Sequence, residues 1–149
     1  MTVYDSDNVF AKILRGEIPA VKIYEDADIL AFMDAMPQGD GHALVIPKAP
    51  SRNLLDADPA TVATLFRAVQ RIARAVRTAF GADGVFVSQY NEPASGQTVF
   101  HLHVHIIPRF EGVPLRGHAA GTFADRAVLA EHAARIRAAL DADNAGPAS

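Results

Sequence analysis

The chain has 149 residues, of which 50% are hydrophobic and 21% charged, and these proportions are typical of one globular domain. Its net charge of −3 does not fit a general nucleic-acid-binding protein, which usually carries a basic surface. The sequence contains no cysteine, which excludes disulfides, thiolate zinc sites and a cysteine nucleophile.

No apolar run approaches the roughly 20 residues that a membrane-spanning helix needs. The N-terminal segment MTVYDSDNVF lacks the basic region followed by an apolar stretch that marks a secretory signal. We therefore expect a cytoplasmic protein that binds neither nucleic acid nor membranes.

A short helix and three strands are predicted in the first third of the chain. Phe10, Ile13 and Leu14 share one face of the helix, and Gly16 lies just past its end. The strands cover residues 21–26, 28–34 and 43–47. Short turns separate these strands, and their order therefore suggests an antiparallel meander.

Residues 59–80 form the clearest predicted helix. Asp58 can cap its N-terminus, Pro59 suits its first position, and Gly81 can end it. Its apolar stripe comprises Val62, Leu65, Phe66, Val69, Ile72, Ala73, Val76 and Phe80. Four arginines lie away from this stripe, where a solvent-exposed face is favoured over a phosphate-binding ridge.

Two further strands are predicted at residues 84–91 and 99–108, joined by a loop of turn formers at 92–98. A second long helix is predicted at residues 124–140, followed by a flexible tail at 141–149. Strands and helices occur without a repeating βαβ pattern. The sequence therefore predicts an α+β domain with an antiparallel sheet and two main helices.

The segment HLHVHII places a histidine at every second position. Because successive side chains of a strand point to opposite faces, His101, His103 and His105 are expected to share one face. Leucine, valine and isoleucine would share the other face and pack on the core. Alternate residues lie about 6.6 Å apart along a strand, which separates the outer histidines by about 13 Å.

Three uses of these histidines can be compared. A shared zinc ion is disfavoured because its nitrogen ligands must converge to about 2.0–2.1 Å from one point, although His42, His118 and nearby acids could add ligands. A purely structural row is disfavoured because neighbouring imidazoles repel when protonated and need partners when buried. Chemistry at a phosphate is favoured, since imidazole can attack, donate a proton or stabilise an anion near neutral pH.

The loop before the histidines supports a phosphate site. In SGQT (95–98), Gly96 permits a close approach of the backbone, and the Thr98 hydroxyl can bind a phosphoryl oxygen. These groups need no metal, and we expect no cofactor.

The segment GQTVFHLHVHII resembles the signature of the histidine triad (HIT) family. Residues 8–26, 29–48 and 88–98 are similar to the branch called histidine triad nucleotide-binding proteins. The resemblance covers about residues 8–110 and implies that the whole chain, residues 1–149, is a single HIT domain. It also implies an α+β fold that pairs as a homodimer.

The resemblance implies attack on the α-phosphorus of a purine nucleotide. His103 matches the nucleophile, which would form a covalent nucleotidyl-histidine that water then cleaves. His105 matches the residue that contacts the α-phosphate and the bridging oxygen, and His101 matches the residue that orients its neighbour. His42 matches the fourth histidine of the family.

Contacts to the substrate are implied at further positions. Asp34 matches the acid that binds the ribose hydroxyls, and Asn91 and Thr98 match residues around the phosphate and the leaving group. Gln97 belongs to the family's G-Q-[ST] motif, where shaping the loop is the favoured role. The apolar base pocket is matched by Val9, Phe10, Ile13 and Ile23.

Two departures from the family pattern affect the predicted substrate. Some bacterial members carry an N-terminal zinc site with cysteine ligands, which this chain cannot form. After the triad, PRFEG is closer to dinucleoside polyphosphate hydrolases than to phosphoramidases, so Arg109 could contact a longer phosphate chain. We expect an adenosine 5'-monophosphoramidase, with a dinucleoside polyphosphate hydrolase or a nucleotide-binding module of little turnover as alternatives.

Overall fold

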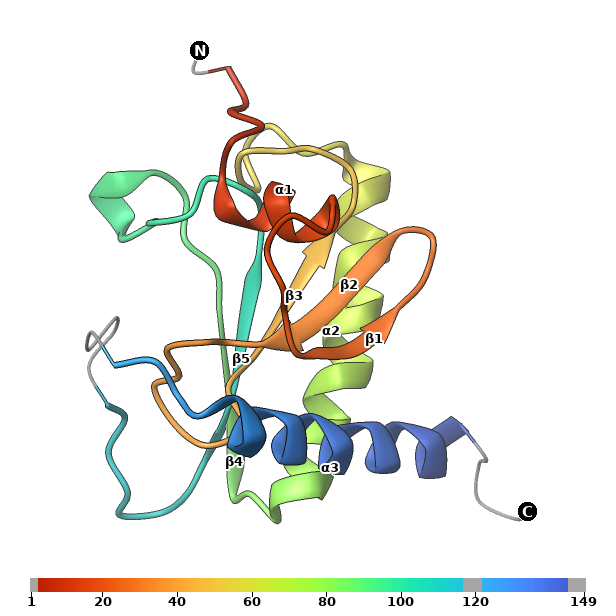
Figure 1. The fold of residues 1–149 in the computed structure, drawn as a ribbon, viewed down its shortest axis with the longest axis vertical. Helices are drawn as coiled ribbons and strands as arrows, with labels where there is room; N and C mark the ends of the chain where they lie inside the picture. Colours follow the sequence, from red (N-terminus) through yellow and green to blue (C-terminus); the bar gives the residue numbers. More distant parts are fainter. Residues whose placement is uncertain (1–2, 117–121, 145–149) are drawn as a thin grey trace.

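The computed structural model describes residues 3–116 and 122–144, which form a mixed α+β domain around one antiparallel sheet (Figure 1). The helices are α1 (Val9–Leu14), α2 (Pro59–Phe80) and α3 (Arg126–Asn144), with a short 3-10 turn at Pro93–Ser95. The strands are β1 (Lys22–Glu25), β2 (Ile29–Met33), β3 (Ala43–Pro47), β4 (Gly84–Ser88) and β5 (Val104–Arg109). The predicted fold class, with its antiparallel sheet and two main helices, is confirmed.

The five strands lie in the order β1-β2-β3-β5-β4. The predicted meander holds for the first three strands. The chain then passes through α2 to β4 at the edge of the sheet, and β5 returns between β3 and β4. The histidine strand is therefore paired on both sides, and its side chains lie beside those of β3.

The last predicted strand begins later than expected, at Val104 rather than at residue 99. His101 and His103 therefore precede β5 and are not part of its ladder. The alternation still separates two faces, because the apolar neighbours pack into the core beneath α2 while the ring of His103 contacts Phe10 of α1. These apolar neighbours are Leu102, Val104 and Ile106.

Two apolar clusters cover the two faces of the sheet. The larger lies between the sheet, α2 and α3, and includes Leu65, Ile72, Val104, Ile106 and Ile136. The smaller lies under α1 and consists of Phe10, Ile13, Leu30, Phe32, Leu44 and Ile46. The short helix α1 thus closes the face of the sheet that carries the histidines.

The ends of α2 follow the predicted capping pattern. The Asp58 carboxylate accepts a hydrogen bond from Ala60 N at 3.0 Å, and Gly81 adopts the left-handed φ of 57° that ends the helix. Phe66, placed in the buried stripe by the sequence pattern, is 40% exposed. None of the helices in the described part of the chain is long and apolar enough to cross a membrane.

The C-terminal helix α3 runs to Asn144, past its predicted end at residue 140. Leu140 near this end is buried against the larger cluster, and this contact supports the helix. Of the tail predicted at 141–149, residues 141–144 belong instead to α3, and residues 145–149 lie outside the described part.

Candidate active site

Four histidines lie buried on the α1 face of the sheet. His42 and His101 are fully buried, and His103 and His105 are at most 6% exposed. The register of β3 and β5 explains one pairing, because Leu44 lies opposite His105 and His42 stands two residues before it. The four rings are therefore gathered from two segments far apart in the chain.

His101 is bonded through both ring nitrogens. Its Nε2 lies 2.7 Å from the carbonyl oxygen of Pro47, which can only accept, so Nε2 carries a proton. Its Nδ1 lies 2.6 Å from the hydroxyl of Tyr4, which donates to the neutral ring. Burial lowers the pKa of His101 from its ordinary value of 6.5, and the ring is therefore neutral near pH 7.

His103 is oriented by the residue that precedes it by two positions. Its Nδ1 lies 2.6 Å from the carbonyl oxygen of His101 and must donate. The lone pair of the neutral ring is then on Nε2. The ring of Phe10 packs edge-on against His103 at 4.9 Å between centroids and limits rotation of the imidazole.

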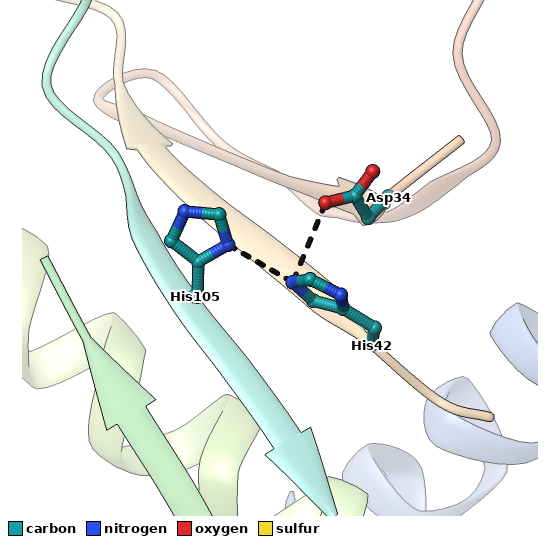
Figure 2. A group of neighbouring side chains, drawn as sticks. All are labelled: Asp34, His42 and His105. Atoms are coloured by element: carbon teal, nitrogen blue, oxygen red, sulfur yellow. Dashed lines mark hydrogen bonds and ion pairs between the residues drawn. The ribbon is translucent and has the colours of Figure 1, made fainter. Parts of the chain in front are cut away.

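A hydrogen-bonded series links His42 and His105 (Figure 2). The backbone N–H of Gln38 donates to Nδ1 of His42 at 3.0 Å, which leaves the proton of the neutral ring on Nε2. This Nε2 lies 2.9 Å from Nδ1 of His105 and 3.4 Å from the carboxylate of Asp34. When His42 donates to His105, the neutral ring of His105 carries its own proton on Nε2.

The two histidines on the cavity wall therefore differ in chemistry. His103 presents a ring nitrogen with a lone pair, and His105 presents an N–H donor. A nucleophile and a donor on ring centroids 5.0 Å apart can act on one phosphoryl group, since its oxygens need hydrogen-bond donors during in-line attack.

Asp34, His42 and His105 are also the group of described residues that could hold a metal ion, with one ligand atom from each within 4.8 Å of the others. Two imidazoles and a carboxylate are ligands that zinc accepts. However, Nε2 of His42 would have to bind the ion, and moving its proton to Nδ1 would oppose the N–H of Gln38. The contacts fit a proton network better. His118, considered as a further ligand, lies outside the described residues.

A cavity of about 640 Å³ lies beside His103 and His105. The structure brings seven predicted site residues to its wall: Val9, Phe10, Ile13, Asp34, Thr98, His103 and His105. The wall is mainly apolar, and its polar residues include Asp34, His103 and His105. This size and lining are typical of pockets for small molecules.

Three predicted substrate contacts are not on this wall. Ile23 is buried in the larger core cluster, so we assign it to the core instead of the base pocket. Asn91 accepts hydrogen bonds from Leu54 N at 3.0 Å and from the side chain of Gln89 at 2.8 Å. Its amide therefore connects two loops instead of reaching the cavity.

Gln97 is buried and bonded within the loop. Its amide nitrogen donates to the carbonyl oxygens of Arg52 and Val99, at 2.8 and 3.0 Å. Its amide oxygen accepts from Asn53 at 3.1 Å and from Glu92 N at 2.8 Å. These bonds agree with the loop-shaping role favoured from the sequence rather than with a contact to substrate.

Two parts of the site were missed in the sequence. Tyr4 reaches His101 from outside every motif, and a single tyrosine in a polar segment gives no signal. Phe123, which precedes α3, and Arg126, its first residue, line the cavity. The bond from Ala124 N to Ala35 O at 2.9 Å holds this segment beside the sheet. Ala35 and Ala124 are 89 positions apart, so no local sequence pattern could have indicated this hydrogen bond.

The family model described as "HIT domain" matches residues 15–112. Among curated proteins, the adenylylsulfatase HINT3 of Arabidopsis thaliana is 42% identical over 106 residues, covering 71% of this chain and 54% of that protein. The solved structure of a Hit-like protein involved in cell-cycle regulation from Bartonella henselae is 56% identical, with a TM-score of 0.86 over 92% of this chain and 99% of that one. A Zn-bound histidine triad family protein from Mycobacterium smegmatis is 38% identical, with a TM-score of 0.81 over 95% and 98% of the two chains.

Proposed function

The chain belongs to the HIT domain family, and we propose that it hydrolyses purine nucleotides at the α-phosphate through a covalent nucleotidyl-histidine. The activity that we place first is adenosine 5'-monophosphoramidase, which cleaves a P–N bond and releases AMP and ammonia. The observation that carries this proposal is the bond of His103 Nδ1 to the carbonyl of His101, which leaves the Nε2 lone pair on a ring of the cavity wall.

In the first step, Nε2 of His103 attacks the α-phosphorus in line with the leaving group. The P–N bond breaks, and the departing nitrogen takes a proton from Nε2 of His105. This proton comes from a His105–His42 pair that starts the reaction with one extra proton, shared across the 2.9 Å contact and stabilised by the Asp34 carboxylate. The product of this step is AMP bonded to His103, with ammonia released.

In the second step, water attacks the phosphorus of this intermediate. The proton of the water passes to the His105–His42 pair, the bond from phosphorus to His103 breaks, and AMP leaves. Each group thereby returns to its starting protonation state. The network recycles one proton per turnover and needs no metal for this purpose.

The rest of the cavity suits a nucleoside. We place the ribose hydroxyls on the carboxylate of Asp34 and the base against the apolar wall formed by Val9, Phe10 and Ile13. Thr98 lines the same cavity and can donate to a phosphoryl oxygen. A carboxylate that accepts from two neighbouring hydroxyls would select ribose over deoxyribose.

One observation bears on the size of the leaving group. Arg109 donates to the carbonyl oxygen of Val113 at 2.8 Å and lines a different surface pocket, beside Asp83 and Glu111. It is therefore held away from the cavity that contains His103. This position favours a small leaving group over the polyphosphate chain of a dinucleoside substrate.

A second candidate substrate comes from the Arabidopsis thaliana relative named as an adenylylsulfatase. Attack at the same α-phosphorus of adenosine 5'-phosphosulfate would release sulfate instead of ammonia. We rank it second because no cation beyond Arg126 lines the cavity among the described residues, and sulfate is a dianion.

We also propose that two chains pair through β4, which forms an edge of the sheet. Phe86 and Val87 on this strand are 43% and 44% exposed, and Phe66 of α2 is 40% exposed. Apolar side chains on an open edge are suited to pairing with a second chain. Sedimentation equilibrium tests this, and Val87→Lys is expected to give monomers.

Steady-state kinetics on an adenosine phosphoramidate, adenosine 5'-phosphosulfate and a diadenosine polyphosphate test the proposed function. We expect the highest kcat/KM on the phosphoramidate, with no loss after treatment with a chelator. Absence of turnover on all three, with AMP still bound, would favour the nucleotide-binding module. A strong loss with chelator would favour a metal site like that implied by the Zn-bound Mycobacterium smegmatis relative.

A further inference from the structure

We propose that Tyr4 is a positioning residue of the active site, whose hydroxyl fixes the His101 ring and thereby the carbonyl that orients His103. This inference rests on the proposed function insofar as His103 is the reacting group. Tyr4 lies outside the matched family region, which begins at residue 15.

The contact between Tyr4 and His101 is close and specific. The hydroxyl lies 2.6 Å from Nδ1 of His101, and the two rings meet edge-to-face at 5.7 Å between centroids. His101 is fully buried, and its other nitrogen is bonded to Pro47 O. Loss of the hydroxyl would leave a buried acceptor without this donor, a change that costs stability and removes one of the two bonds that fix the orientation of the ring.

The anchoring of His101 matters because the sheet does not hold this residue. His101 precedes β5, which begins at Val104, so it has no ladder partner. Its segment is held by the two side-chain bonds of His101, by the bond from Leu102 N to Ser51 O at 2.9 Å, and by the burial of Leu102 in the larger cluster. The carbonyl that receives Nδ1 of His103 therefore depends on how the His101 side chain is fixed.

The N-terminal segment is itself well anchored and can hold Tyr4 in place. The side chain of Asn8 caps α1 and donates to Asp5 O at 2.7 Å. Arg15 donates to Ser6 O at 2.8 Å. These bonds connect Asp5 and Ser6, which follow Tyr4, to α1 and its C-terminal end. The same helix contacts His103 through Phe10.

Tyr4 and His101 have the protonation states that a hydrogen bond from the tyrosine hydroxyl to the imidazole requires. Burial raises the pKa of Tyr4, so its hydroxyl keeps its proton near neutral pH. Burial lowers the pKa of His101, so its ring stays neutral there. The hydroxyl then donates, and Nδ1 accepts.

Tyr4→Phe removes only the hydroxyl, and Tyr24→Phe is the matched control. Tyr24 also donates a hydrogen bond through its hydroxyl, to Asp26 at 2.7 Å, but this bond is exposed and involves no histidine. The first measurement is the ¹⁵N spectrum of the histidine rings without substrate. We expect the Nδ1 signal of His101 to shift in Tyr4→Phe, because Nδ1 loses its hydrogen-bond donor, and to be unchanged in Tyr24→Phe.

The second measurement is turnover of the phosphoramidate. We expect kcat to fall about 3- to 10-fold in Tyr4→Phe with KM nearly unchanged, the size expected for one lost hydrogen bond, and no change in Tyr24→Phe. An unshifted His101 signal in Tyr4→Phe would overturn the inference, as would an unchanged kcat. A loss of kcat seen only in Tyr4→Ala would also overturn it, because that result assigns Tyr4 to packing. The ring spectrum needs no activity, so it tests the Tyr4 contact even if the proposed reaction fails.

Discussion

Nε2 of His42 lies 2.9 Å from Nδ1 of His105, although the two residues are 63 positions apart in the chain. The pairing of β3 with β5 produces this contact, and the N–H of Gln38 determines its direction by occupying the other nitrogen of His42. Proton donation therefore runs from His42 to His105 and on to the cavity. Asp34, at 3.4 Å, stabilises any positive charge that this pair acquires.

Replacing His42 should disable His105 without removing it. We expect His42→Ala to lower kcat about 10- to 100-fold, less than direct loss of a donor to the phosphate, which costs about 10²–10³. KM should change little, because His42 does not line the cavity. The matched control is His132→Ala, which removes a buried histidine that packs on Phe80 and does not line the cavity. A His42→Ala enzyme as fast as the control would contradict the relay.

Replacing His103 should separate binding from chemistry. We expect His103→Ala to abolish turnover while AMP still binds, because the apolar wall and Asp34 remain. Acid quenching of the unmodified enzyme during turnover, followed by peptide mass spectrometry, should locate AMP on His103. Recovery of the label on His101 or His105 would show that the nucleophile has been misassigned.

Local patterns predicted most of the fold and the centre of the site. The alternation around His103 identified the two faces, and Asp58 and Gly81 marked the ends of α2, because capping and side-chain direction depend on nearby residues. The insertion of β5 between β3 and β4 was not predictable in this way, since strand order depends on contacts far apart in sequence.

Contacts between distant parts of the sequence also explain why three predicted substrate contacts do not line the cavity. An isoleucine looks equally suited to a base pocket or to the core, and only the packing of β1 on the larger cluster assigns Ile23 to the core. The side chain of Asn91 is able to bind phosphate, but it is hydrogen-bonded to Leu54 and Gln89. The bonds of Gln97 within its loop agree with the loop-shaping role that the sequence favoured. The role of Tyr4 depends on one contact across 97 residues, which no spacing rule describes.

The segment that precedes α3 should contribute to affinity for the nucleoside. Phe123 lines the cavity and is 72% exposed, so its ring can pack on a base. We expect Phe123→Ala to raise KM about 3- to 10-fold with kcat nearly unchanged, the size expected for one aromatic contact. Val128→Ala removes an exposed apolar side chain of α3 that does not line the cavity, and it should leave KM unchanged. Equal KM values for both variants would exclude Phe123 from the binding site.

Acid should destabilise the fold partly through His101. Burial lowers the pKa of His101 in the folded protein, whereas the unfolded chain binds a proton near the ordinary value of 6.5. Below that pH the unfolded state therefore holds more protons, and the free energy of unfolding falls as the pH drops toward the folded pKa.

Urea titrations between about pH 7 and pH 5 measure this change. Glu92, whose pKa is lowered from 4.5 chiefly by its hydrogen bond with Arg52, titrates below that window and does not obscure it. In His101→Gln the group is absent, so the decline over the same range should be smaller than in the unmodified protein. Identical declines in the two proteins would show that His101 is protonated as readily in the folded state as in the unfolded one.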